Sequence, residues 1–464
     1  MTDGAPTSIR PQNGVTQMAR KFFVFLHRWA GLAMAVFLVV VGLTGSVLAF
    51  REELDVWLNP ELFIVAKRDA PLLDGFTLRE KAAALYPDAS FDGVQLRIEP
   101  DRSVGFVHMP GMRPTDNMME KMVEFYLDPY TGEKLGERPA WSGPSLERKN
   151  IMSFLYRLHF SLALPWSWSI GDHSVGAYIL GVTALVWTID CFIAFYLTFP
   201  LRWRANGDVS LAAKSWWRRW KPAWLIKLNA DAYRINFDIH RAFGLWTWAM
   251  LFVLAWSSVA FNLTEVYTPT MKTLFGMSEQ ASKAPARAAR LENPALGWRE
   301  AYARGGALLH AQADRRGLAI EEEQFLSLDR DSGVYTLSAR SSGDFTKRGA
   351  TYIKFDADTG ALLEASIPGD PTKRTGDVMT LWLIWLHMAA VFGLPMQIFL
   401  CAMGLVITAL SVTGVYIWLK KRRARKFSSQ LAMRLDESTE IASTWHASES
   451  PHVRRGVSPE VAHE

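Results

Sequence analysis

The sequence predicts an α-helical integral membrane protein, a four-span bundle built by internal duplication, with two small α+β modules outside the bilayer. Four apolar runs are each long enough to cross a bilayer. A histidine motif opens two of them, as LHRWAGL at 26–32 and IHRAFGL at 239–245. Each copy continues to an Asp-x-x-Thr-Gly turn and then to a Leu-His pair. The step from the turn Asp to that His is 31 residues in both copies, Asp128 to His159 and Asp356 to His387.

Composition sets the class of protein. The chain has 464 residues and 49% hydrophobic content, enough for a membrane bundle and two modest domains rather than one globular core. Its two cysteines, Cys191 and Cys401, both fall inside apolar runs, so no disulfide framework holds the outer modules. We read the net charge of +5 as a sign of membrane topology and expect no nucleic-acid partner.

The spans are expected at about 22–50, 175–199, 243–266 and 396–419. The first is interpreted as a retained span rather than a signal peptide, because it is long, lacks a small-x-small cleavage site and carries a repeated motif. Basic residues near span ends stay in the cytoplasm, which predicts that both termini are cytoplasmic and that segments 51–149 and 267–378 lie outside. The basic residues are Arg20, Lys21, Arg202, Arg204, Lys214, Arg218, Arg219, Lys221, Lys227 and 420–423.

The two outer segments repeat one order of elements. The first predicts a helix at 77–86 and strands at 91–98, 104–109 and 123–127. The second predicts a helix at 298–313 and strands at 324–328, 333–338 and 351–355. In both, the Asp-x-x-Thr-Gly turn is expected to close a hairpin. From about Lys426 the chain is expected to be unstructured, and its histidines, His446, His452 and His463, to be solvated.

Histidines in or beside apolar helices are costly and usually functional. Six-coordinate haem needs two imidazoles on opposite faces of one ring, so ligands come in pairs at equal depth. The duplication supplies two pairs, His27 with His240 near the cytoplasmic face and His159 with His387 near the outer face. The second pair is expected on short surface helices that turn into the returning spans. For a single histidine, headgroup contact is the simpler interpretation; four in register favour haem.

Glycines accompany the histidines. Gly31 and Gly244 each follow a histidine by four residues, which places them on the same helix face with no side chain to obstruct a macrocycle. Gly45, 18 residues after His27, returns to that angle about 27 Å along the axis and leaves room for a second macrocycle. Close helix packing is the alternative explanation for such small residues.

Four residues break or extend the symmetry. His173 has no counterpart, and is a candidate ligand in place of His159, a proton donor or a water-facing residue. Asp190, inside the second span, is either a proton or quinone-site residue or the partner in an interhelical hydrogen bond. Arg28 and Arg241 follow the cytoplasmic histidines and suit either haem propionates or a role as positive-inside anchors.

These motifs in this order resemble the PepSY-associated transmembrane family over about 20–420. The resemblance implies PepSY-like outer modules, a place in the bacterial inner membrane, and a relation to iron-regulated proteins that include ferric-siderophore reductases with two b-type haems. It implies haem iron ligation by His27, His240, His159 and His387, with His173 leaving the outer ligand set open.

The function implied is electron transfer through two haems b to a ferric siderophore or similar chelate outside the membrane. Hard oxygen chelators hold iron(III) far more tightly than iron(II), so one-electron reduction releases the metal. Since no dinucleotide-binding fingerprint occurs, the donor is a membrane quinol or a cytoplasmic reductase. The resulting division is 1–20 tail, 21–50 span, 51–149 module, 150–200 interfacial helix and span, 201–234 basic link, 235–266 span, 267–378 module, 379–420 interfacial helix and span, and 421–464 disordered tail.

Two alternatives stay open. A methionine-rich segment favours copper(I) handling, although methionine also fills cores; it comprises His108, Met109, Met112, Met118, Met119 and Met122. A non-enzymatic membrane-anchored module that binds a partner predicts no pigment. The tryptophans near the outer histidines are candidates for a substrate pocket or for interfacial anchors; they are Trp166, Trp168, Trp382 and Trp385.

Overall fold

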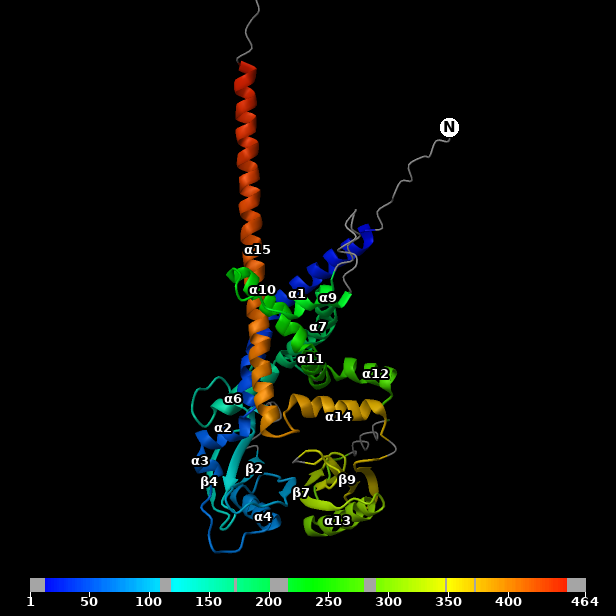
Figure 1. Cartoon of the computed structure of the whole chain (residues 1–464). Coiled ribbons are helices and arrows are strands. Elements are labelled where there is room, and N and C mark those ends of the chain that lie inside the picture. The colour runs from blue at the N-terminus through cyan, green and yellow to red at the C-terminus, as the bar shows by residue number, and fades with distance from the viewer. Residues whose placement is uncertain are drawn as a thin grey trace, which may run out of the picture.

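The computed structural model describes residues 13–108, 118–170, 173–200, 216–278, 289–346, 349–370 and 373–448. Figure 1 shows a group of long helices with β-sheets gathered at one end. The start of α1 (Asn13–Leu48) and the end of α15 (Leu394–Ser448) leave at the opposite end. We call these two ends the sheet side and the tail side.

Three helices are long and apolar enough to cross a bilayer, over 17–48 in α1, over α7 (Val175–Thr198) and over 394–430 in α15. The third predicted span is a bent pair, α10 (Ala232–Trp246) and α11 (Trp248–Asn262), whose axes differ by 70°. The break falls at Thr247, whose hydroxyl bonds the Phe243 carbonyl at 2.7 Å, an i−4 bond that often bends helices. The described chain is thus an α-helical membrane protein with three spans, or four if the bent pair counts as one.

α1 and α15 cross closely because small residues meet at the crossing. A Cβ added to Gly42 would lie 2.7 Å from the Gly404 carbonyl oxygen, and one added to Gly404 would lie 2.4 Å from that of Gly42. The Ser46 hydroxyl bonds the carbonyls of Gly42 and Cys401, both at 2.9 Å. Close backbone approach by small residues is the usual way that helices associate in a membrane.

Two antiparallel sheets form the sheet side. One has the order β2 (Val104–His108), β3 (Val123–Leu127), β4 (Lys134–Pro139) and packs on α4 (Gly75–Leu85). The other has the order β1 (Gly93–Gln95), β7 (Ile320–Asp329), β8 (Val334–Ser341), β9 (Thr351–Asp356), β10 (Leu362–Ser366) and packs on α13 (Trp298–Asp314). The predicted helices and strands therefore occur in both segments, and β4 and β10 are additions.

The pairing of β1 corrects the prediction of two separate outer modules. β1 comes from the first segment but pairs with β7 of the second, with Val94 opposite Leu326. Val94 is fully buried in the core of the five-stranded sheet. The two segments therefore share a sheet and a core, because β1 pairs with β7 and its Val94 packs into the core of that sheet.

The repeated turns close hairpins as expected. Asp128 accepts bonds from the N–H groups of Tyr130 and Thr131 between β3 and β4, and Gly132 has φ +71°. Asp356 does the same between β9 and β10, where Gly360 has φ +68°. Positive φ explains the glycine in each motif.

Short elements join sheets and spans: α2 (Arg51–Leu58), α3 (Pro60–Phe63), α5 (Met118–Lys121), α6 (Ile151–Ser161), β5 (Ser169–Ile170), β6 (His173–Ser174), α9 (Trp216–Trp220), a 3-10 turn at Lys221–Trp224, α12 (Thr264–Phe275) and α14 (Thr375–His387). α2 is held to β4 by a buried ion pair in which Arg138 bonds both carboxylate oxygens of Asp55, at 2.7 and 2.8 Å. This pair fixes the first sheet beneath the end of α1.

The tail expected to be unstructured from Lys426 is instead helical to Ser448, as a continuation of α15. No glycine or proline occurs between Gly414 and Pro451, and Ala, Leu, Arg, Lys and Glu are good helix formers. Polarity was therefore a poor guide to disorder here. His452 and His463 lie outside the described residues.

Candidate functional site

The four symmetric histidines meet in two pairs. His27 of α1 and His240 of α10 form the tail-side pair, with ring centres 6.1 Å apart. His159 of α6 and His387 of α14 form the sheet-side pair, with ring centres 6.4 Å apart. Each pair thus joins one histidine from each half of the chain.

α1 connects the two pairs. Its His27 belongs to the tail-side pair, and its Thr44 hydroxyl lies 3.0 Å from Nδ1 of His159. The 17 residues between them correspond to about 25 Å of helix. The pairs therefore stand near opposite ends of the bundle.

Every ring has a partner at Nδ1. His27 Nδ1 lies 2.9 Å from both carboxylate oxygens of Asp190, and His387 Nδ1 lies 2.7 Å from the Ser257 hydroxyl. His240 Nδ1 lies 3.0 Å from the Leu410 carbonyl oxygen and 3.1 Å from the Thr413 hydroxyl.

These partners fix the tautomer. A carbonyl oxygen or a carboxylate can only accept, so Nδ1 of His240 and of His27 carries the proton. The hydroxyls of Thr44, Ser257 and Thr413 already donate to carbonyls four residues back, at 2.7 Å each, which leaves their lone pairs to accept from Nδ1. In all four rings Nε2 is then the unprotonated nitrogen, the state in which imidazole binds a metal.

The glycines on the histidine-bearing spans and on α15 differ in what lies beside them. A Cβ at Gly45 would lie 3.1 Å from Cε1 of His159, and one at Gly414 would lie 3.3 Å from Cε1 of His240. These two glycines therefore make room for imidazoles rather than for a macrocycle. At Gly31 and Gly244, in contrast, no atom of the described residues lies within 4 Å of an added Cβ.

The pairs fit haem. Two imidazoles bound on opposite sides of one iron, with metal–nitrogen bonds of about 2.0 Å and ring radii of roughly 1.1 Å, have centres about 6.2 Å apart. The observed 6.1 and 6.4 Å match that spacing. Among the described residues no group of three or more His, Cys, Asp or Glu is placed to hold a metal ion, so an iron at either pair needs a ligand that brings its own donors, as a porphyrin does.

His173 belongs to neither pair. It lies in β6, and its Nε2 is 3.3 Å from a carboxylate oxygen of Glu265 in α12. His159 is the residue whose ring faces His387.

The arginines that follow the tail-side histidines differ from each other. Arg241 bonds the Pro222 carbonyl at 2.6 Å and the buried Asp238 carboxylate at 2.8 Å. Arg28 lies over the rings of Phe25 and Trp29. Arg241 thus helps to hold α10 against the 3-10 turn, and the Nε–H of both arginines is buried without a hydrogen-bond partner among the described residues.

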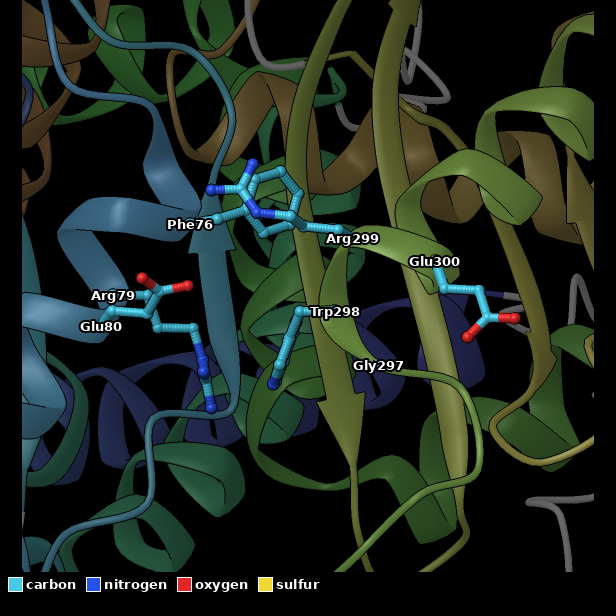
Figure 2. Close-up of a pocket in the computed structure, with 7 residues that line it drawn as sticks. All are labelled: Phe76, Arg79, Glu80, Gly297, Trp298, Arg299 and Glu300. Carbon is cyan, nitrogen blue, oxygen red and sulfur yellow. The ribbon is translucent and has the colours of Figure 1, made fainter.

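Two cavities occur on the sheet side. One of about 400 Å³ lies between α4 and α13, and Figure 2 shows Arg79 beside Trp298 and Arg299 over Phe76. It lies at the end of the sheets remote from α6 and α14, the two helices that carry the sheet-side pair (Figure 1).

The other cavity, of about 380 Å³, adjoins α6 and is lined by Glu120, Pro139, Trp141, Ser142, Gly143, Pro144, Ser145, Asn150 and Arg157. We call it the α6 cavity. Arg157 is two residues before His159 on that helix. Ser142 and Arg157 are 3% and 6% exposed, and the Ser142 hydroxyl and Arg157 Nε find no hydrogen-bond partner within the described part of the chain. The Trp141 indole N–H is likewise buried without one.

The methionine-rich segment shows a core contact where it is described. The His108 ring is buried and stacks on Tyr86 at 3.8 Å between centres. Burial lowers the pKa of His108. Met109 and Met112 lie outside the described residues.

The four tryptophans near the sheet-side histidines differ in burial and in contacts. Trp166 is buried under Arg157 and beside Trp141, whereas Trp168 is exposed. Trp382 and Trp385 pack on each other, and Trp382 also meets the exposed ring of Phe345.

The hydroxyl partners were missed from the sequence, although a signal exists. Thr44 follows His27 by 17 residues, and Ser257 follows His240 by 17 residues. Each bonds the sheet-side histidine of its own half. A comparison of the two halves for polar residues within the apolar runs finds them.

A search of curated proteins returned no match. The model of one family, described as the PepSY-associated TM region, matches residues 24–421, a stretch that includes both histidine pairs. The chain therefore belongs to the PepSY-associated transmembrane family.

Proposed function

We propose that this protein holds two haems b, one at each histidine pair, and carries electrons across the membrane to reduce ferric chelates on the sheet side. We place it in the bacterial inner membrane with both termini in the cytoplasm, since the basic residues gather on the tail side.

One observation carries the proposal. Both pairs have the ring spacing that a shared iron requires, and all four rings hold their Nδ1 protons on accepting groups. Histidines that merely contact lipid headgroups have no need of matched spacing or of a common tautomer. Bound haem supplies an iron that accepts and gives up one electron at a time.

The residues of the chain do the remaining work. Asp190, Thr44, Ser257 and the Leu410 carbonyl orient the rings, and such partners typically strengthen metal binding tenfold to a hundredfold. α1 links the two pairs, because it carries His27 of the tail-side pair and Thr44, which bonds His159 of the sheet-side pair. This arrangement leads from one face of the bilayer to the other.

We propose the α6 cavity as the site of the ferric chelate. The Ser142 hydroxyl, Arg157 Nε–H and Trp141 N–H have no partner among the described residues, and these hydrogen-bond donors suit an anionic chelator rich in oxygen. Reduction of iron(III) to iron(II) by one electron weakens its hold on hard oxygen donors and releases the metal. The cavity between α4 and α13 is a poorer candidate because it is remote from α6 and α14, which carry the sheet-side pair.

The test uses full-length protein in liposomes, with dithionite inside, a ferric hydroxamate chelate outside and an iron(II)-specific dye to follow release. We expect release by the wild type and its loss in His159→Ala. His310→Ala is the matched control, since His310 lies on α13 and its Nε2 faces Glu323 at 3.4 Å. Release that persists in His159→Ala, or none by the wild type with bound haem, would contradict the proposal.

A second pair of variants tests the cavity. At Gly143 an added Cβ would meet only Arg157 Nη1, at 4.0 Å, and at Gly297 in the remote cavity no described atom lies within 4 Å. Gly143→Leu should fill the α6 cavity and lower kcat/KM at least tenfold with haem retained. Gly297→Leu should not. The reverse result assigns the chelate to the cavity between α4 and α13.

A further inference from the structure

The two halves of the chain differ at one buried position next to the tail-side pair. Asp190 of α7 bonds Nδ1 of His27, and Thr413 of α15 bonds Nδ1 of His240. Each comes from the returning span of its own half. One position therefore carries a carboxylate and the other a hydroxyl.

Asp190 is 6% exposed, and both its oxygens lie 2.9 Å from His27 Nδ1. Within the described residues, the His27 ring is the only side chain with which this carboxylate forms a hydrogen bond or a charge contact. An unneutralised buried carboxylate is costly, so its place here is expected to serve the histidine.

The other three rings have neutral acceptors. His159 uses Thr44, His387 uses Ser257, and His240 uses a carbonyl and a hydroxyl. A carboxylate pulls the Nδ1 proton more strongly than these groups do and makes the opposite nitrogen a stronger donor. Its charge also favours the more positive state of a nearby metal.

We propose that Asp190 is a positioning residue that acts through His27 to give the tail-side haem a lower potential than the sheet-side haem. The proposal rests on the proposed function. One electron then moves downhill from a ferrous tail-side centre, which becomes ferric, to a ferric sheet-side centre, which becomes ferrous. No bond is formed or broken in this step, and no proton is exchanged.

This assigns a direction to the bundle. Both pairs use bis-histidine ligation, so the ligands alone give no preferred direction. The single carboxylate makes the tail side the donor side and the sheet side the acceptor side. The competing explanation is an interhelical hydrogen bond without redox effect. It predicts that an isosteric neutral variant has the same two potentials as the wild type.

The test is a spectroelectrochemical titration of the detergent-purified full-length protein. Asp190→Asn keeps an acceptor oxygen and removes the charge. We expect it to raise the lower of the two potentials by at least 59 mV, which for one electron is a tenfold change in the equilibrium constant. The higher potential should not change. The double variant Asp190→Asn with Thr413→Asp places a carboxylate beside His240, the other ring of the tail-side pair. It should lower the potential of the tail-side haem again.

His387→Ala provides a reading that does not depend on Asp190 variants. It should retain only the tail-side haem, with the potential of the lower wild-type couple. The inference is overturned if that haem titrates with the higher couple, or if Asp190→Asn shifts neither couple. Wild-type protein without haem would refute the proposed function instead, so the two failures are distinguishable.

Discussion

Gly176→Ala provides a demanding structural prediction, because Gly176 lies where α7 meets the end of α6. A Cβ added there would lie 1.7 Å from the Ser161 carbonyl oxygen and 2.5 Å from its carbonyl carbon. Ordinary carbon–oxygen contacts are about 3.3–3.6 Å. Backbone atoms cannot rotate away, so the end of α6 must move by about 1.7 Å.

His159 is two residues before Ser161 and moves with it. Metal–ligand distances vary by only about 0.2 Å, so a displacement of this size breaks the sheet-side pair and leaves the tail-side pair intact. We expect haem content to fall from about two to about one per chain, with overpacking also costing about 1–3 kcal/mol of stability.

The assay is pyridine-haemochrome quantification on purified protein. Gly181→Ala is the matched control: it overpacks the same helix, with a Cβ 2.6 Å from Leu263 Cγ, which can rotate, and 3.3 Å from the nearest backbone atom, the carbonyl carbon of Asn262. It should retain both haems. Full haem content in Gly176→Ala, or equal loss in Gly181→Ala, would refute the reasoning.

Three further predictions follow from single contacts. Thr44→Val removes the acceptor for Nδ1 of His159 and should speed loss of the sheet-side haem to apomyoglobin about tenfold; unchanged rates would count against the assigned tautomer. Asp55→Ala leaves the buried Arg138 with only the less buried carboxylate of Glu124, 3.0 Å from its Nε, and should cost about 3 kcal/mol in thermal unfolding; a loss below 1 kcal/mol would contradict this. Partial burial raises the pKa of Asp377, but bonds from the hydroxyl and the N–H of Ser278 and from the N–H of Arg374 outweigh burial and hold that pKa below its ordinary value. Its contribution is thus present above an ordinary carboxyl pKa of about 3.9 and is lost as pH falls through the lowered value. Circular dichroism between pH 5 and 2 should show a smaller acid loss in Asp377→Asn, and identical curves would disprove it.

Exposed ion pairs give the control for the buried one. Arg148 and Glu61 are joined at 2.6 Å, with side chains 60% and 50% exposed. Glu61→Gln should change stability by less than about 1 kcal/mol.

Periodicity and repetition made much of the fold predictable. The apolar runs predicted the span positions, and the strand patterns predicted β2, β3, β7, β8 and β9. The repeated Asp-x-x-Thr-Gly motif predicted the two hairpin turns through local chemistry alone. These features depend on residues close together in sequence.

What the sequence left open depends on contacts between distant segments. The pairing of β1 with β7 joins residues about 230 positions apart, which no local pattern records. The bend at Thr247 could not be predicted, because the apolar run continues through it without a break. The helical end of α15 shows that helix propensity outweighed polarity.

The histidines themselves were visible because they repeat, whereas their Nδ1 partners lie on other helices. Asp190 stood out as a charge inside a span, but its contact with His27 crosses 163 positions of sequence. Thr413 and Gly414 gave no signal of their own. Their role follows from packing against α10.

The measurement that tests the central claim most directly is the haem content of the detergent-purified wild type, from oxidised and dithionite-reduced spectra with pyridine-haemochrome quantification. The account predicts about two haems b per chain, falling to about one in His27→Ala and in His387→Ala and unchanged in His310→Ala. A colourless protein from haem-sufficient cells, or a haem content indifferent to His27 and His387, would contradict it.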